Sequence, residues 1–164
     1  MRFIEGLSSV AARVTRWIVI GAAAVMIISL ILQIFFRYVV GSSLVWSEEL
    51  ALFLFTWVVL LAGSLGVREN FHVRLTLFLD LLPPRVKWGF NLVIHLISGF
   101  FGGLVAYSGY HYLDATLGQV SAAVRYPIEF LHAAAPVCGV LIVLHTLANL
   151  GAMMASRTRS AGHE

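Results

Sequence analysis

The sequence has few charged residues. Asp, Glu, Lys and Arg together make up 12% of its 164 residues, while hydrophobic residues make up 60%; a soluble domain is nearer about 25% charged and about 45–50% apolar. This composition excludes an ordinary water-soluble domain and indicates a membrane protein. The net charge of +3 is small. The basic residues gather near the ends of apolar runs, which suits membrane orientation and gives no sign of nucleic-acid binding.

Cysteine is nearly absent as well. The single Cys138 lies in an apolar run, so an internal disulfide and a cysteine metal site are excluded, and we expect a small core residue. The sequence also lacks a P-loop, an H-E-x-x-H motif, a G-x-S-x-G motif and a glycine-rich dinucleotide turn. No pair of carboxylates lies inside an apolar run, where a proton or ion relay would need it. We therefore predict a non-enzyme with no catalytic or substrate-binding residue, no metal and no cofactor.

Long apolar runs are present instead, at residues 17–40, 50–67, 88–113 and 128–154. Each is about long enough for a helix to cross the ~30 Å hydrocarbon layer of a membrane. At this chain length a single domain is the simplest division. The sequence therefore predicts an all-α integral membrane protein of one domain, residues 1–164, with four transmembrane helices and a polar tail at 155–164.

A short segment between the second and third runs has a different pattern. Its apolar residues recur at helical spacing on one side: Phe71, Leu75, Phe78 and Leu82. A lone strand here would leave its backbone unpaired in the membrane interface. We therefore expect a short amphipathic helix at 71–82, lying in the interface and ended by Pro83 and Pro84.

The basic residues predict how the four helices are oriented. Four crossings place both termini on one side of the membrane. The N-terminal segment, the link between the second and third helices and the tail hold nine Lys and Arg residues, whereas the other two links hold only Arg37 and Arg125. Because cytoplasmic segments carry the excess of Lys and Arg, we expect both termini in the cytoplasm.

The second helix opens with two carboxylates, Glu48 and Glu49. They follow Trp46, which suits a membrane interface, and Ser47, a candidate N-cap. The positive end of the helix dipole favours acidic residues in a first turn, and this alone explains both carboxylates. The alternative is that one of them pairs across an interface with a basic residue. The candidates are Arg37 and Arg125 of this chain and a basic residue of a partner protein.

A heptad spacing favours Glu49 for that interface role. Glu49, Thr56, Gly63 and Asn70 recur every seven residues, close to two helical turns, so they share one stripe. Small and polar residues on one stripe let a second helix approach closely. Glu48 is rotated by about 100° from this stripe, so we expect it to face water or headgroups.

Other patterns predict helix packing. A polar stripe in the first helix consists of Ser29, Gln33 and Arg37. It should face protein, although Arg37 can instead snorkel to the headgroups. In the third helix, the G-x-x-x-G spacing of Gly99 and Gly103 permits close helix contact. Pro136 lies inside the fourth run and predicts a kink there.

The histidines support a rival hypothesis. His95 and His145 fall at similar depth near the predicted inner face, and His111 and His132 near the outer face. Paired histidines on facing helices can ligate haem. The rival function is therefore a haem-bearing, four-helix membrane anchor of a respiratory redox complex. A packed histidine in the protein interior is the commoner arrangement.

The stretch from Trp46 to Pro84 resembles a known family: the small, DctQ-like membrane subunits of TRAP transporters, the tripartite ATP-independent periplasmic uptake systems. The resemblance lies in the sequence Trp-Ser-Glu-Glu-Leu-Ala at residues 46–51 and in the later residues Trp57, Gly63, Gly66, Arg68 and His72. An amphipathic stretch ending at Pro83 completes it. Two positions depart from the family. It often has Gly shortly before the His, where this chain has Asn70 and Phe71. It often has Asp four residues after the His, where this chain has Thr76.

The resemblance implies a function. Such a subunit is a fixed, non-catalytic scaffold in the bacterial inner membrane. It packs against a large multi-span permease subunit that carries the substrate and sodium sites, and a periplasmic substrate-binding protein captures an organic acid. The residues expected at the subunit interface or in a structural role are Arg37, Trp46, Glu48, Glu49, Thr56, Gly63, Gly66, Arg68, His72, Gly99 and Gly103.

Overall fold

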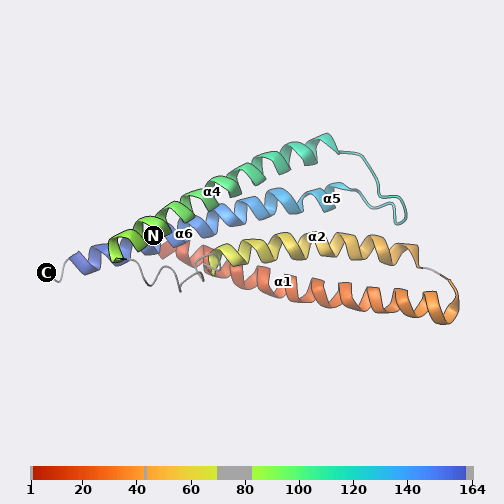
Figure 1. Ribbon diagram of the computed structural model, residues 1–164. Helices are drawn as coiled ribbons and strands as arrows, with labels where there is room; N and C mark the ends of the chain where they lie inside the picture. Colours follow the sequence, from red (N-terminus) through yellow and green to blue (C-terminus); the bar gives the residue numbers. More distant parts are fainter. Residues whose placement is uncertain (1, 43, 70–82, 162–164) are drawn as a thin grey trace.

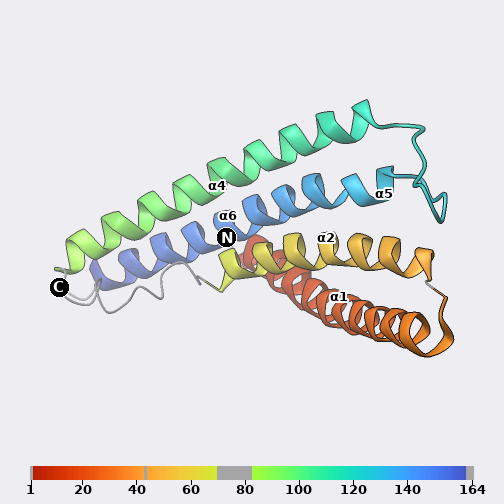
Figure 2. The same cartoon turned by 45° about the vertical axis from the view of Figure 1, so that its right-hand side comes forward.

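The computed structural model describes residues 2–42, 44–69 and 83–161. Its elements are α1 (Arg2–Phe35), the π-helical turn η1 (Phe36–Val40), α2 (Val45–Arg68), α4 (Pro84–Ala115), α5 (Glu129–His132) and α6 (Ala134–Ala161). As Figures 1 and 2 show, α1 and α2 form one antiparallel pair, and α4 forms a second pair with α5 and α6. The two pairs are joined mainly by contacts between α2 and α6.

The bundle has two ends, which differ in the segments that they hold. The start of α1 and the end of α6 lie toward one end, here named the terminal end (Figure 1). The opposite end, here named the loop end, holds the α1–α2 link and the α4–α5 loop, residues 116–128. Four helices that cross the membrane in alternating directions place both chain ends at one end of the bundle and these two links at the other.

Helices long and apolar enough to cross a membrane span Ile4–Val40, Val45–Arg68, Val86–Ala115 and Glu129–Ala155. They confirm the predicted all-α architecture with four membrane-spanning helices. The interfacial helix expected at 71–82, and His72 with it, lies outside the described residues.

The first and last helices extend beyond the apolar runs. α1 begins at Arg2 and not near residue 17, and its early turns bury a stripe of small residues at helical spacing: Ser8, Ala12 and Thr15. α6 continues to Ala161, into the segment expected as a polar tail. Hydropathy misses both extensions because it marks the hydrocarbon crossing and not the end of the helix.

The link between α1 and α2 turns sharply at Gly41, whose φ of 75° lies in the left-handed region that glycine adopts without a steric penalty. α2 then begins at Val45, with Leu44 at the N-cap position and no side-chain cap. Ser47 is buried inside the first turn, where its hydroxyl donates a hydrogen bond to the Leu44 carbonyl at 2.7 Å. The prediction that Ser47 caps α2 is therefore wrong.

Glycine permits the close crossing of α4 and α6. A Cβ on Gly102 would lie 2.5 Å from Cγ2 of Ile142, and Gly139 faces the α4 backbone. Gly99, from the predicted G-x-x-x-G pair, packs on Thr146, whereas Gly103 has nothing within 4 Å of its missing Cβ. The tightest contact therefore depends on glycines that the G-x-x-x-G spacing does not include.

The fourth membrane helix is interrupted near Pro136, where a kink is expected. α5 ends at His132 and α6 begins at Ala134. The ring of Pro136 blocks the carbonyl of His132, four residues earlier, and proline has no N–H to donate to it. α4 fits against this irregularity through Gly109, since a Cβ there would lie 2.8 Å from the Pro136 nitrogen.

Candidate subunit interface

Glu49 binds the α4–α5 loop. Its Oε1 accepts a hydrogen bond from the Ala123 N–H at 2.9 Å, and its Oε2 accepts one from the Val124 N–H at 2.7 Å. The Ser121 hydroxyl donates a third bond to Oε2 at 3.0 Å. Two successive backbone N–H groups that converge on one anion form a nest. Glu49 thus holds the loop against α2, just after the first turn of this helix.

The α4–α5 loop is itself folded. Ser121 N–H donates to the Tyr126 carbonyl at 2.9 Å, and Ile128 N–H donates to the Gln119 carbonyl at 3.0 Å. Arg125, at its tip, has a φ of 59°. Residues other than glycine rarely adopt this left-handed backbone conformation. The loop therefore has a defined turn that presents the amides of Ala123 and Val124 to the carboxylate.

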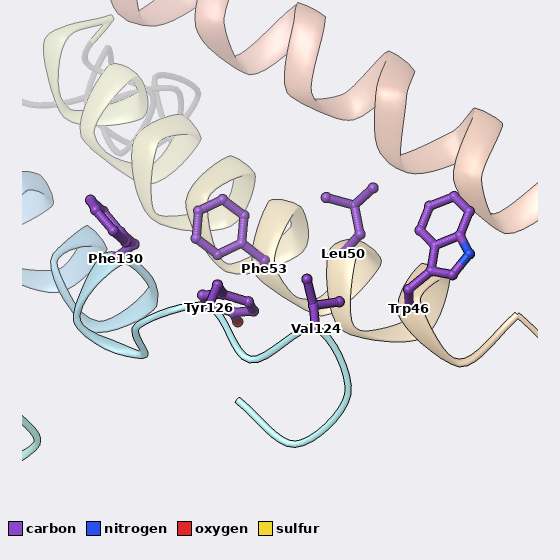
Figure 3. A pocket seen from close by; sticks show the side chains of 6 residues that line it. All are labelled: Trp46, Leu50, Phe53, Val124, Tyr126 and Phe130. Atoms are coloured by element: carbon purple, nitrogen blue, oxygen red, sulfur yellow. The ribbon is translucent and has the colours of Figure 1, made fainter. Parts of the chain in front are cut away.

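An apolar pocket of about 480 Å³ lies between α2 and this loop. It is lined by Trp46, Leu50, Phe53, Val124, Tyr126 and Phe130. Figure 3 shows Trp46, Leu50 and Phe53 along α2, opposite Val124 and Tyr126 of the loop. The rings of Phe53 and Tyr126 meet edge to face at 5.5 Å between centroids, and Trp57 Nε1–H donates to the Phe130 carbonyl at 3.0 Å. Burial, and then the charge of Glu49, raise the pKa of the Tyr126 phenol.

A second polar cluster joins three helices near the terminal end. Arg68 of α2 donates a hydrogen bond to the hydroxyl of Ser8 in α1. The same hydroxyl lies 2.8 Å from Nδ1 of His145 in α6. Ser8 and His145 are completely buried. Because Arg68 supplies a hydrogen to the Ser8 oxygen, the hydroxyl hydrogen can go to His145 Nδ1, which favours the tautomer with the proton on Nε2.

A groove between α1 and α2, named here the α1–α2 groove, opens near the loop end. Its lining consists of Met26, Leu30, Gln33, Glu48, Ala51, Leu52 and Phe55. The Gln33 amide donates to Oε1 of Glu48 at 2.6 Å. Ser29 is buried and donates to the Ser47 carbonyl at 3.4 Å. Ser29 and Gln33 of the predicted polar stripe therefore face α2, whereas Arg37 is exposed.

The other residues predicted for the subunit interface do not gather at one place in the structure. Thr56 donates to the carbonyl of Leu52 in its own helix at 3.0 Å, and Gly63 has nothing within 4 Å of its missing Cβ. Gly66 is half-buried. Neither Arg37 nor Arg125 pairs with Glu49, whose partners in the described chain are the Ser121 hydroxyl and two loop amides.

The histidines of the described helices either are buried or contact neighbouring side chains. His132 Nδ1 lies 2.7 Å from the Thr116 hydroxyl, and its ring stacks at a tilt on Tyr112. His111 contacts the ring of Tyr107, and His95 is buried. Within the described ranges, no three His, Cys, Asp or Glu side chains gather to hold a metal ion.

These features define a multi-pass membrane protein whose polar side chains connect its own helices and whose apolar faces remain largely exposed. The model of the family described as Tripartite ATP-independent periplasmic transporters, DctQ component, matches residues 26–155. The chain belongs to this family. The resemblance seen in Trp46 to Pro84 is thereby confirmed and extends over most of the chain.

Named relatives include both small and large permease proteins. The chain is 27% identical over 129 residues to the sialic acid TRAP transporter small permease protein SiaQ of Vibrio cholerae, covering 74% of this chain and 70% of that protein. It is 31% identical over 114 residues to the sialic acid TRAP transporter permease protein SiaT of Haemophilus influenzae, covering 70% of this chain but 18% of that protein. The isethionate TRAP transporter permease protein DctMQ of Oleidesulfovibrio alaskensis is 26% identical over 145 residues, which is 82% of this chain and 22% of that protein.

Sequence reasoning missed Ser8, His145 and the α4–α5 loop as structural partners. Ser8 and His145 are separated by 137 positions, so no local spacing could have connected them. The loop gave a weak signal, since Ser121 and the small residues Ala122 and Ala123 suit a backbone that must approach a carboxylate closely. Nothing in a helical stripe indicates that a carboxylate will bind backbone amides.

Proposed function

We propose that the chain is the non-catalytic scaffold subunit of a sodium-driven TRAP uptake transporter in the bacterial inner membrane. In this proposal it packs against a large multi-span permease subunit, and both its termini are cytoplasmic. A periplasmic substrate-binding protein delivers an organic acid to the assembly.

This proposal rests on how small a part of two longer relatives the chain matches. A sequence similar to most of this chain makes up 18% of SiaT and 22% of DctMQ. In those proteins the segment is covalently joined to a much larger permease polypeptide. We expect the separate chain to bind a separate permease subunit that corresponds to the remainder of those polypeptides.

The exposed surface agrees with a partner in the membrane. The most apolar windows of α1 and α4 are only 6% and 11% buried within the chain. Apolar side chains on these helices therefore face lipid or another protein, and helix association in membranes depends on close packing and interhelical hydrogen bonds. The chain offers both, through its grooves and its polar side chains.

An organic acid is the substrate class that the relatives' names support. SiaT and SiaQ are named for sialic acid, DctMQ for isethionate, and a small permease protein of Vibrio cholerae for C4-dicarboxylates. All are anions at neutral pH. The choice among them would belong to the large subunit and the binding protein, because the described part of this chain offers no evident substrate site.

Purification from native membranes tests the proposal. The chain, tagged at its C-terminus, is isolated in mild detergent, and its partners are identified by mass spectrometry. We expect a large permease similar to the rest of SiaT. After reconstitution with the binding protein, uptake of an organic acid should require an inward sodium gradient.

Two results would change this conclusion. Recovery of flavoprotein and iron–sulfur subunits, together with a stoichiometric Soret band that shifts on reduction, would replace it with the haem-anchor hypothesis. If the permease is recovered but uptake does not depend on the sodium gradient, the scaffold role stands and sodium is not the coupling ion.

A further inference from the structure

We infer that the α1–α2 groove docks one transmembrane helix of the large permease subunit, and that this helix carries a Lys or Arg at the level of Glu48. The inference rests on the proposed function, which supplies the partner. It assigns the intersubunit charge contact to Glu48. The heptad spacing had favoured Glu49 for this role and predicted that Glu48 faces water or headgroups.

The shape of the groove suits a helix. Its volume is about 480 Å³. On α1 the lining runs from Met26 to Gln33 and on α2 from Glu48 to Phe55, which is about two helical turns, or ~10 Å, on each side. Leu52 and Phe55 are 65% and 54% exposed, so the described chain leaves more than half of each side chain uncovered. A helix could place side chains from two successive turns into such a space.

Among the carboxylates at the loop end, Glu48 is the one that lines this groove, whereas Asp114 is exposed at the end of α4. Glu49 is occupied by the α4–α5 loop, and Glu129 accepts a hydrogen bond from the Gly118 N–H at 2.9 Å. Glu48 has an uncharged partner, the Gln33 amide. Across the described residues, the one ion pair within 4 Å is Arg16–Glu69, on the other half of the bundle.

A basic residue from the partner completes this arrangement. Glu48 borders apolar side chains of the groove, where an unpaired carboxylate is poorly solvated once a partner covers it. The helix dipole offsets part of that cost, and Gln33 holds one carboxylate oxygen in place while the other remains available. A Lys or Arg that meets this oxygen forms a charge-assisted hydrogen bond. The same residue would meet no carboxylate in the wholly apolar pocket beside Phe53.

Site-specific photocrosslinking tests the docking surface. A photoreactive phenylalanine analogue replaces Leu52 or Phe55 in the groove. The control position is Phe100 of α4, which is 70% exposed and lies outside this groove. In native membranes we expect crosslinks to the large permease from the two groove positions and none from Phe100.

The charge is tested separately with Glu48→Gln, which can still accept the Gln33 hydrogen bond and removes only the charge. We expect the permease to dissociate from the purified complex roughly thirtyfold faster or more, as for other buried charge pairs at interfaces. Glu48→Asp should restore much of the retention. Glu69→Gln, at an exposed ion pair on the terminal half, is the matched control and should leave retention unchanged.

The outcomes separate this inference from the proposed function. If the permease co-purifies but crosslinks to Phe100 and not to the groove, the docking inference is wrong and the scaffold function stands. Crosslinks from the groove only to phospholipid or to a second copy of the chain also overturn it. If no permease co-purifies with the wild-type chain, the proposed function fails and the inference fails with it. Unchanged retention in Glu48→Gln rejects the charge contact alone.

Discussion

Gly139 of α6 lies against the backbone of Ala106 in α4, and a Cβ added to Gly139 would lie 2.4 Å from the Ala106 nitrogen and 2.6 Å from the Gly102 carbonyl oxygen. Backbone atoms cannot move aside as a flexible side chain can. The two helices therefore cross at a distance that only glycine permits at this position. The crossing joins α4 to the rest of the bundle, because α4 packs mainly on α6.

We expect Gly139→Ala to destabilise the protein by about 1–3 kcal/mol, the usual cost of overpacking. Gly103→Ala is the matched control, since its added methyl meets nothing within 4 Å. It should be neutral or stabilise by up to ~1 kcal/mol through helix propensity. Thermal unfolding of both variants in the same detergent, followed by circular dichroism, measures the difference. Equal unfolding temperatures would contradict the close crossing.

The Ser8 cluster makes a second prediction about stability. Ser8→Ala removes the hydroxyl that contacts both Arg68 and His145, and both side chains lose a buried partner. We expect a loss of about 1–3 kcal/mol in the free energy of unfolding. Ser9→Ala is the control, because the Ser9 hydroxyl bonds only to the Gly6 carbonyl one turn earlier at 2.7 Å. Similar unfolding curves for the two variants would show that the cluster contributes little.

The sequence predicted the architecture well because long apolar runs are a direct consequence of the membrane environment. It placed the four crossings and the break near Pro136. It did not predict the contacts of individual side chains, since these depend on which helices become neighbours. Glu49 illustrates the difference: its helical position was correct, but its partners lie 72 to 75 positions away along the chain. The Ser47 cap failed because α2 begins two residues earlier.

The distribution of Lys and Arg predicts the orientation of the bundle in the membrane, and reporter fusions test this prediction. We expect fusions after Pro84 and Arg159 to report the cytoplasm, and fusions after Ser43 and Gln119 to report the periplasm. This prediction rests on the nine basic residues of the first set of segments, against Arg37 and Arg125 on the other. Cytoplasmic signals from the Ser43 and Gln119 fusions would reverse the orientation.

Arg125 offers a direct measure of how firmly Glu49 holds the α4–α5 loop. Trypsin cleaves after Arg125 only when the loop opens, and three hydrogen bonds to the carboxylate oppose that opening. In Glu49→Gln, an amide NH₂ replaces one accepting oxygen and faces donors. Each hydrogen bond to a charged group contributes about 1.5–3 kcal/mol, so the loss of one should raise the rate of cleavage about tenfold or more. Cleavage is followed in spheroplasts by the appearance, on an immunoblot, of a C-terminally tagged fragment that begins at Tyr126 and keeps the last membrane helix. Glu69→Gln is the matched control, because Glu69 pairs with Arg16 near the terminal end and not with the loop. If both variants are cleaved at the wild-type rate, the loop keeps its shape without the carboxylate, and Glu49 acts only through the helix dipole.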